Sequence, residues 1–422
     1  MREMINSGIE WLKEIPRDWK IERLQWHMYE INDKNSPIKT TNVLSLTNKR
    51  GVIPYEEKGA QGNISKENYN EYKIAYKDTI VANSMNILIG SVGYSNYEGC
   101  VSPVYYVFKE KDGNDLRFLN YILQTVQFQK ELRKYANGIL EIRLRVSSND
   151  ILKRQAAFPS LDEQERIAAF LDKECSKIDS IYADVEKQIE TLEQYKRSVI
   201  TEAVTRGLNP NVELCQSGID YIDKTPKHWK IKRLKYILTE RNERSITGTE
   251  TLLSVSQYLG VIPSSDNKMR TMQADSLVGY KIVKKDDLVF NKLNPGLARF
   301  GWSNYDGITS PDFAVYVVDK KECSAKFLQY LLKTERYVTS FKGIGLGVGD
   351  GFARLYTPQL YNYFVSIPAI DELNEIVAYL EQKCAEIESV IADKKKQLEV
   401  LENYKKSLIY EYVTGKKEVV NE

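Results

Sequence analysis

The chain contains one internal repeat that spans nearly its whole length, and this repeat limits the fold more than any other feature. Residues 7–24, SGIEWLKEIPRDWKIERL, return as residues 217–234, identical at 9 of 18 positions. Residues 158–205 align without a gap to residues 367–414, with 23 of 48 positions identical. Each copy is a globular part of about 155 residues followed by a helical part of about 50. The chain is therefore expected to fold as two related units in tandem.

The globular parts mix strand and helix signals. Short runs rich in β-branched and aromatic residues, such as TIVAN at residues 79–83 and FAVYVV at residues 313–318, predict strands between turns. Residues 116–135 and 325–341 have the apolar spacing of helices. We therefore predict an α+β domain in each copy. The predicted segments are residues 1–157 and 208–366 for the two globular domains, 158–207 for a central long helix, and 367–422 for a distal long helix with a C-terminal tail.

The helical parts carry an apolar seam in which steps of three and four residues alternate, which is typical of a coiled coil. Two such helices in one chain pack most economically on each other, and the connection through the second domain makes them antiparallel. Lys196 and Lys405 interrupt the seam at the same place in both copies. Either they fix the register, or their stems carry the amines out to solvent. The predicted seam residues are Leu171, Ile178, Tyr182, Ile189, Leu192, Val199, Leu380, Ile387, Ile391, Leu398, Leu401 and Leu408.

Composition narrows the functional classes. The formal net charge is only +2, the two histidines are His27 and His228, and the five cysteines are scattered without a CxxC pair. His-dependent catalysis and a metal site are therefore not expected. No apolar run approaches the roughly 18–20 residues of a membrane span, and the N-terminus does not look like a secretory signal. The predicted location is the cytoplasm, with no membrane partner.

Two related heads held in opposite orientation by a stiff helix pair suit duplex DNA. The backbone of a duplex has twofold symmetry, so such heads meet equivalent grooves at a fixed spacing. Because the two domains have diverged, the two half-sites should differ in sequence. Arg and Asn side chains in the polar loops are well shaped for base contacts, although each can equally be an ordinary solvated residue. The candidate DNA-contacting residues are Lys49, Arg50, Asn83, Asn86, Arg143, Arg145, Lys268, Arg270, Asn291, Lys292, Asn294, Arg299 and Arg354.

These features together resemble the HsdS-like specificity (S) subunit of type I restriction–modification systems, over nearly the full length. The shared motifs are the SGIxWLxxIPxxW opening at residues 7–19, repeated at 217–229, the blocks YKDTIVAN at 76–83 and KKDDLVFN at 284–291, and PSLDEQ at 159–164. The second copy of the last motif, PAIDEL at 368–373, departs from the pattern by lacking the glutamine. The joint pattern is specific, whereas any one block alone is not.

The resemblance implies an α+β fold with two tandem pseudo-symmetric target-recognition domains, separated by two long antiparallel coiled-coil helices. It implies a non-catalytic DNA-specificity subunit in which each domain reads one half of an asymmetric bipartite site and the helices set the spacer. The implied partners are double-stranded DNA, two methyltransferase subunits that dock on the helices and domains, and restriction translocase–nuclease subunits. S-adenosylmethionine, ATP and Mg²⁺ would belong to those partners, and no cofactor to this chain.

Three alternatives remain open at this point. The chain lacks the Asn/Asp-Pro-Pro-aromatic motif of an adenine methyltransferase, and the glycine-rich residues 343–351 lack the Lys-Ser/Thr of a phosphate loop, so catalysis by the chain itself is disfavoured. A coiled-coil scaffold would not need two elaborate α+β domains. The specificity chain of a fused type II restriction–methylation enzyme is not separable from a type I subunit by sequence.

Overall fold

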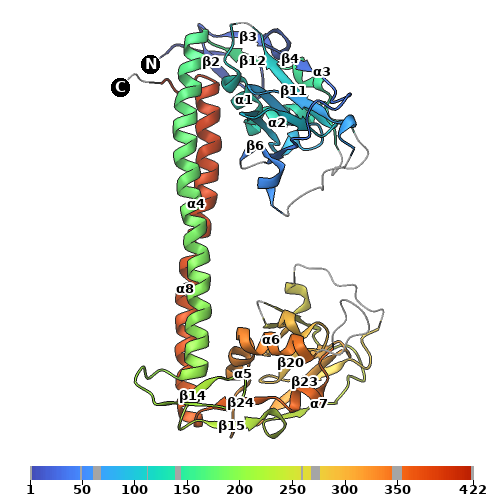
Figure 1. The fold of residues 1–422 in the computed structure, drawn as a ribbon, viewed down its shortest axis with the longest axis vertical. Coiled ribbons are helices and arrows are strands. Elements are labelled where there is room, and N and C mark those ends of the chain that lie inside the picture. Colours follow the sequence, from blue (N-terminus) through green and yellow to red (C-terminus); the bar gives the residue numbers. More distant parts are fainter. Residues whose placement is uncertain are drawn as a thin grey trace. The chain divides into compact units, whose positions relative to one another are not determined.

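The computed structural model describes residues 2–47, 50–59, 68–111, 113–137, 144–257, 260–267, 276–344 and 354–419. Contacts within the chain divide it into two compact units (Figure 1). Unit 1 combines Met1–Glu186 with Lys396–Glu422, and unit 2 is Lys187–Lys395. Both long helices pass from one unit to the other, so each unit contains one globular domain and a part of each helix.

Unit 1 is an α+β domain in which short antiparallel strands precede three helices and a last strand. Its strands are β1 (Met4–Asn6), β2 (Glu14–Pro16), β3 (Lys20–Arg23), β4 (Met28–Ile31), β5 (Leu44–Thr47), β6 (Gly51–Pro54), β7 (Lys73–Ala75), β8 (Thr79–Asn83), β9 (Val92–Ser95), β10 (Gly99–Val101), β11 (Tyr105–Glu110) and β12 (Gln155–Phe158). Its helices are α1 (Leu116–Gln124), α2 (Val126–Arg133) and α3 (Ser148–Leu152), with 3-10 turns η1 (Leu24–Trp26), η2 (Tyr55–Lys58), η3 (Tyr69–Glu71) and η4 (Ile87–Ile89).

Unit 2 repeats this order of elements. Its strands are β13 (Leu214–Gln216), β14 (Lys224–Pro226), β15 (Lys230–Arg233), β16 (Leu238–Glu240), β17 (Leu253–Ser256), β18 (Gly260–Pro263), β19 (Lys281–Val283), β20 (Leu288–Asn291), β21 (Phe300–Trp302), β22 (Gly307–Thr309), β23 (Phe313–Val318) and β24 (Phe364–Ile367). Its helices are α5 (Ala325–Leu332), α6 (Glu335–Ile344) and α7 (Thr357–Tyr361), with 3-10 turns η6 (Leu234–Tyr236), η7 (Ser264–Asp266) and η8 (Pro295–Leu297).

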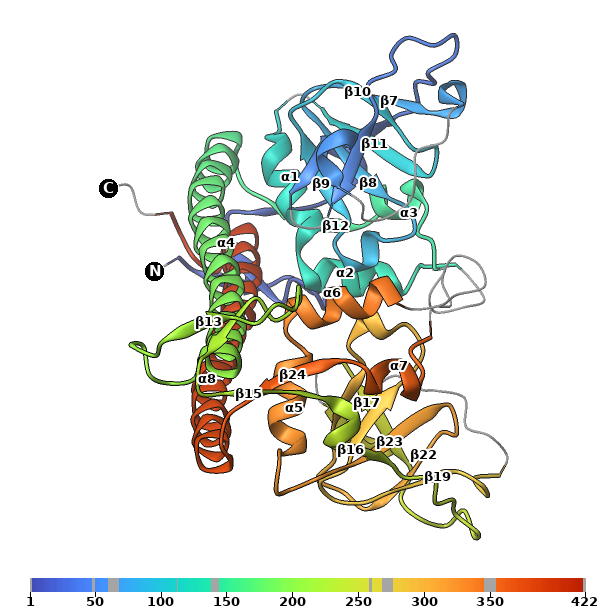
Figure 2. The ribbon, with the colours of Figure 1, turned by 60° about the horizontal axis from the view of Figure 1, so that its bottom comes forward.

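The central sheet has the same antiparallel topology in both units. Its strand order is β4-β11-β8-β9 in unit 1 and β16-β23-β20-β21 in unit 2, and several of these strands are labelled in Figure 2. Val81 on β8 lies opposite Val107 on β11, and Val289 on β20 lies opposite Val315 on β23. The register therefore matches between the copies, and the expected α+β fold with internal pseudo-symmetry is confirmed.

Both faces of the central sheet are covered, which explains the uninterrupted apolar run TIVAN. On β8, Ile80 and Ala82 face the main core with Phe118 of α1, whereas Val81 packs into a second cluster with Leu44 of the β5–β6 hairpin. Alternate residues of a strand point to opposite faces. All five residues of β8 are therefore buried.

Residues 116–135 form two helices rather than the single helical segment that their spacing suggested. Thr125 adopts an extended conformation between α1 and α2, and its side chain caps α2 by accepting a hydrogen bond from the backbone N–H of Phe128. A threonine that bonds to the backbone competes with helix continuation. In unit 2 a similar break separates α5 from α6.

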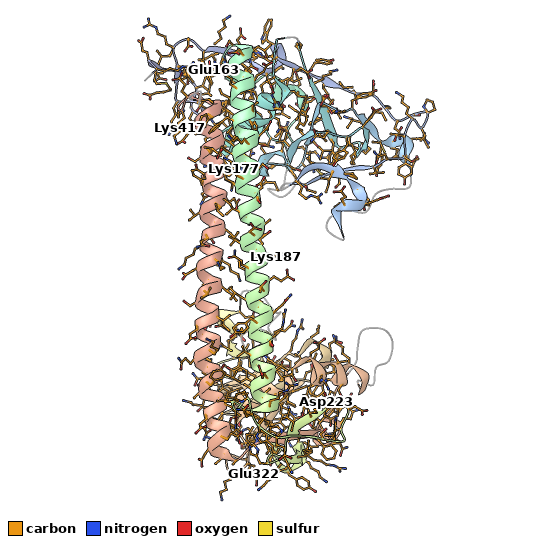
Figure 3. The ribbon with its side chains drawn as sticks, turned by 60° about the vertical axis from the view of Figure 1, so that its left-hand side comes forward. Glu163, Lys177, Lys187, Asp223, Glu322 and Lys417 are labelled. Carbon is orange, nitrogen blue, oxygen red and sulfur yellow. The ribbon has the colours of Figure 1, made fainter. Side chains whose placement is uncertain are left out.

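The two long helices are α4 (Leu161–Arg206) and α8 (Ile370–Val413), and they pair antiparallel within each unit. In unit 1 the rings of Phe170 and Tyr412 lie 4.4 Å apart, and Lys405 Nζ donates to Asp179. In unit 2 Lys394 Nζ donates to Gln188 Oε1 at 2.6 Å. Figure 3 shows Glu163 and Lys417 at the same end of the helix pair of unit 1. Phe170, early in α4, therefore meets Tyr412, late in α8, as the antiparallel prediction required.

The predicted seam lies on the inward side of the helix pair. Seven of its twelve members are buried, and the other five are half-buried. Buried seam residues are Leu171, Ile178, Val199, Leu380, Ile387, Ile391 and Leu408, and half-buried ones are Tyr182, Ile189, Leu192, Leu398 and Leu401. The helix ends also belong to the cores of the domains, since Leu171 packs with unit 1 and Leu380 with unit 2.

The two long helices begin at Leu161 and Ile370, three residues after Phe158 and Ile367. Phe158 is the last residue of β12 and lies opposite Lys20, and Ile367 likewise lies opposite Lys230. The following residue is proline in each copy, and proline holds the residue before it in an extended conformation. The same prolines therefore end a strand just before each helix begins.

Lys333, which caps the C-terminal end of α5, makes the stability of unit 2 depend on pH. Burial, assisted by the positive charge of Lys196, lowers the pKa of Lys333 to about 8. Its amine donates to the carbonyl oxygen of Gln257 at 3.0 Å. The unfolded chain, in which lysine has its ordinary pKa of about 10.4, binds more protons between pH 8 and 10. The contribution of Lys333 to the free energy of unfolding should therefore become more favourable as pH rises through this window.

Chemical denaturation of the wild type and of Lys333→Met, followed from pH 7 to pH 10, measures this effect. The stability difference should shift towards the wild type with increasing pH. Lys227→Met is a suitable control because Lys227 is an exposed lysine of the same unit. A stability difference that does not change with pH would show that Lys333 keeps its proton when the chain folds.

Candidate nucleic-acid interface

The loops that follow β8 and β20 are shaped by a buried asparagine at the strand end. Asn83 accepts a hydrogen bond from the backbone N–H of Met85 at 3.0 Å, and Asn291 accepts one from Leu293 at 2.9 Å. Both side chains are buried. An asparagine that binds the backbone two residues later turns the chain. These two candidates for DNA contact therefore hold the loops in shape.

Each loop then forms a single 3-10 turn supported by a helix. The turn η4 packs on α2, and η8 packs on α6. Asn86, just before η4, is exposed, and Asn294, just before η8, has a positive φ of 49°. Asparagine tolerates this left-handed conformation better than most residues. The tip of η4 also presents an apolar side chain, because Ile89 is 67% exposed.

A distant segment brings an arginine beside each loop. The backbone N–H of Val146 donates to Ser84 O at 3.2 Å, which places Arg145 next to the loop after β8. In unit 2, Leu355 N–H donates to Lys292 O at 3.0 Å, which places Arg354 next to the loop after β20. Both arginines are exposed. The structure thus joins candidates that are about 60 residues apart in the sequence.

A largely desolvated ion pair accompanies this site in each unit, and the sequence analysis missed it. Lys73 Nζ donates to Glu30 Oε1 at 3.3 Å, and Lys281 Nζ donates to Glu240 Oε1 at 3.0 Å. These side chains are 5% to 22% exposed. The available signal was the recurrence of Lys73 and Lys281 in the repeated YKI motif. Burial opposes ionisation of Glu240, but hydrogen bonds from Thr357 and Lys281 outweigh it and lower its pKa.

Unit 2 concentrates positive charge at this place. Burial lowers the pKa of Lys292, and the nearby charges of Lys281 and Arg354 add to that effect. Glu240 and Asp312 act in the opposite direction. In unit 1 the equivalent of Lys292 is the buried Ser84. An anion or a group with several hydrogen-bond acceptors would relieve the mutual repulsion of these cations.

The other candidates are distributed around the two domains. Arg50 lies on the β5–β6 hairpin, is exposed, and pairs with Glu57. Arg299 is exposed at the exit of the loop after β20, where its carbonyl oxygen accepts from Asn291 N–H at 2.9 Å. Arg50 does not belong to the loop sites described above. The remaining candidates, Lys49, Arg143, Lys268 and Arg270, lie outside the described residues.

The two seam lysines reach across to an acid on the facing helix. Lys405 Nζ donates to both carboxylate oxygens of Asp179, at 2.6 and 2.7 Å, and Lys196 pairs with Glu388. Their side chains are 28% and 27% exposed. Partly exposed pairs of this kind contribute at most about 1 kcal/mol each. Because both pairs link the same repeat positions, they favour one register of the helices, so both interpretations of these lysines apply in part.

The repeated opening motif packs against the end of a long helix in each unit. In unit 1, Tyr410 Oη donates to the carbonyl oxygen of Trp11 at 3.0 Å, and Lys416 Nζ donates to that of Leu12 at 2.7 Å. In unit 2, Trp229 Nε1 donates to Glu372 Oε1 at 3.1 Å, close to Gly207 at the end of α4. The motif therefore fixes the helix ends to the domains.

Among the described residues, no group of three or more His, Cys, Asp or Glu side chains could hold a metal ion. None of the helices in this part of the chain combines the length and apolar character that crossing a membrane requires.

Two diverged copies of one α+β domain, each carrying polar loops and parts of two antiparallel helices, define a class of duplicated recognition proteins. Residues 16–191 match the family described as the type I restriction modification DNA specificity domain. The resemblance to type I restriction–modification specificity subunits is therefore confirmed.

Similar proteins extend the match to nearly the full length. The MjaVIII specificity subunit of Methanocaldococcus jannaschii is 23% identical, with 96% of this chain and 95% of that protein covered. The putative MjaX specificity subunit of the same organism is 21% identical, with 96% and 94% covered.

Solved structures share the fold. A chain from a structure of the type I R-M system, solved to explain complex assembly and conformational transition, matches with a TM-score of 0.69, 13% identity, and 96% and 99% coverage. The HsdS subunit of Thermoanaerobacter tengcongensis matches with a TM-score of 0.50, 14% identity, and 96% and 98% coverage.

Proposed function

We propose that this chain is the DNA sequence-specificity subunit of a type I restriction–modification enzyme. Each globular domain reads one half of an asymmetric bipartite site, and the paired helices set the unread spacer. The observation that carries this proposal is the duplication of one fold with equivalent loops whose side chains differ between the copies. Equal scaffolds with unequal loops suit the reading of two different half-sites.

The partners follow from this role. Double-stranded DNA is the ligand, two methyltransferase subunits dock on the helices and domains, and restriction translocase–nuclease subunits complete the enzyme. The chain itself contributes recognition rather than catalysis. S-adenosylmethionine, ATP and Mg²⁺ are then bound by the partner subunits. The full-length relatives named as type I subunits favour this system over a fused type II enzyme.

The decisive experiment combines the chain with its methyltransferase subunit. Methylome sequencing of a host that expresses both should reveal N6-methyladenine in one split, asymmetric motif. Binding of the purified complex to that duplex should fall steeply as salt rises, because phosphate contacts release counterions. A host that expresses the methyltransferase alone is the control. Methylation without a split motif, or equal binding to all duplexes, would refute the proposal.

A further inference from the structure

The two units provide an internal comparison of their loops, because equivalent hydrogen bonds identify equivalent positions. Asn83 N–H donates to Ser91 O at 3.0 Å, and Asn291 N–H donates to Arg299 O at 2.9 Å. The bonds from Val146 to Ser84 and from Leu355 to Lys292 correspond in the same way. Ser91 and Ser84 in unit 1 therefore occupy the places of Arg299 and Lys292 in unit 2.

Some residues of the loop sites are the same in both units. Arg145 and Arg354 directly precede Val146 and Leu355, whose backbone bonds to the loops correspond, so the two arginines are equivalent, and both are exposed. In unit 1 the guanidinium of Arg145 contacts only the sulfur of Met85, at 3.7 Å, among the hydrogen bonds found in the described residues. Neither arginine is needed to fill the core. An exposed arginine at the same place in two diverged domains indicates a shared task.

Other positions differ in chemical character between the units. Ser84 and Ser91 are buried, small and neutral, with 5% and 3% exposure. Their equivalents Lys292 and Arg299 are long cations, half-buried and exposed respectively. Unit 2 therefore presents two long cationic donors from its loop, where unit 1 has only buried serine hydroxyls.

These two groups suit different parts of DNA. Phosphates are the same at every position, so a residue kept in both domains can bind them without carrying sequence information. A side chain that differs between domains can distinguish two half-sites. Lysine and arginine donate hydrogen bonds and accept none, and the O6 and N7 atoms of guanine are the acceptors that they contact most often in the major groove.

We infer that Arg145 and Arg354 bind the DNA backbone, one in each half-site, and that Lys292 and Arg299 read guanine in the second half-site. This inference rests on the proposed function and assigns residues to it. Unit 1 has serine at the two equivalent positions, Ser84 and Ser91. These positions therefore do not recognise a guanine in the first half-site. The crowding of Lys292 with Lys281 and Arg354 fits this role, because acceptors on DNA would offset their repulsion.

The test uses the chain in complex with its methyltransferase subunit and the motif found by methylome sequencing. Affinities for the cognate duplex, for duplexes with single base-pair changes, and for an unrelated duplex are measured at several salt concentrations. Arg145→Ala and Arg354→Ala should weaken binding to all duplexes by similar factors. Each should also reduce the slope of log affinity against log salt by about one.

The loop variants should behave differently. Lys292→Ser and Arg299→Ser, which install the residues of unit 1, should each reduce discrimination at one G·C pair of the second half-site by about 10- to 100-fold. Discrimination in the first half-site should not change. Lys227→Ser is the matched control, because it removes an exposed lysine of unit 2 on the β13–β14 hairpin, away from this loop. It should leave the recognised base pairs unchanged.

The outcomes separate the two levels of the argument. If the wild-type complex binds all duplexes equally, the proposed function fails. If it discriminates, but Arg354→Ala alters the preferred base pairs or the serine variants weaken all duplexes alike, only the residue assignment is overturned. Arg354→Lys provides a second measurement, because it keeps the charge and should retain most of the salt dependence. Thermal unfolding of each variant establishes that the measured changes do not arise from unfolding.

Discussion

Insertion of seven residues after Glu186 in α4 alone is expected to abolish binding to the bipartite site. Asp179 and Lys196 of α4 are separated by 17 residues, as are their partners Lys405 and Glu388 of α8. One added heptad makes α4 about 10 Å longer between these two pairs. The seam keeps its period, but the registers in unit 1 and unit 2 can no longer both be satisfied. Either one pairing breaks or the added turns are expelled from the helix.

The matched variant has seven residues added to both helices, after Glu186 and after Lys395. Both registers are then restored, and the complex should bind a site whose spacer is longer. The measurement is binding to a series of duplexes that differ only in spacer length. An unchanged optimal spacer, or undiminished binding by the variant with one insertion, would contradict the role of the helix pair in setting the spacing.

Phe300→Ala is expected to unfold unit 2 selectively. Phe300 is fully buried, stacks on Phe290 with ring centroids 4.6 Å apart, and meets the edge of Phe341 at 6.3 Å. Truncation of such a side chain costs about 3–5 kcal/mol, because the cavity is only partly refilled. The lost ring also supports the sheet edge from which the loop with η8 emerges. Recognition of the second half-site should therefore be lost, while recognition of the first half-site is retained.

Val92→Ala is the matched control in unit 1, because Val92 is the equivalent of Phe300 and is 2% exposed. It removes fewer carbon atoms, so the loss of stability should be smaller. Hydrogen exchange of both variants measures the outcome, with protection lost in unit 2 for Phe300→Ala and largely retained in unit 1. Equal loss of protection in both units would show that the chain unfolds as a single cooperative body.

The main architecture was predictable because it depends on regular spacing. The seam from Leu171 to Leu408 has a period that only paired helices satisfy, and the predicted runs at β8 and β23 are strands. The details that failed depend on single residues in context. The break at Thr125 arises because its side chain accepts a hydrogen bond from the backbone N–H of Phe128 in α2, which depends on tertiary context and not on apolar spacing.

The candidate site was only partly predictable. Composition singled out Arg145 and Arg354 as possible contacts, but nothing in their spacing places them beside the loops after β8 and β20. Residue type alone also could not distinguish the buried Asn83 and Asn291 from exposed asparagines. The ion pairs of Lys73 and Lys281 escaped notice because lysine is usually exposed.

The sequence by itself determined that the chain has two copies of one fold, an antiparallel pair of helices and diverged loops. These features follow from repeated motifs and from the spacing of apolar residues, both of which can be read directly from the order of the amino acids. Only the tertiary structure decided which stretches of the two long helices belong to each unit and which segments form each loop site. Each unit takes one stretch from α4 and one from α8, and each loop site joins segments distant in the chain. Such meetings depend on packing between remote residues, which no local pattern encodes.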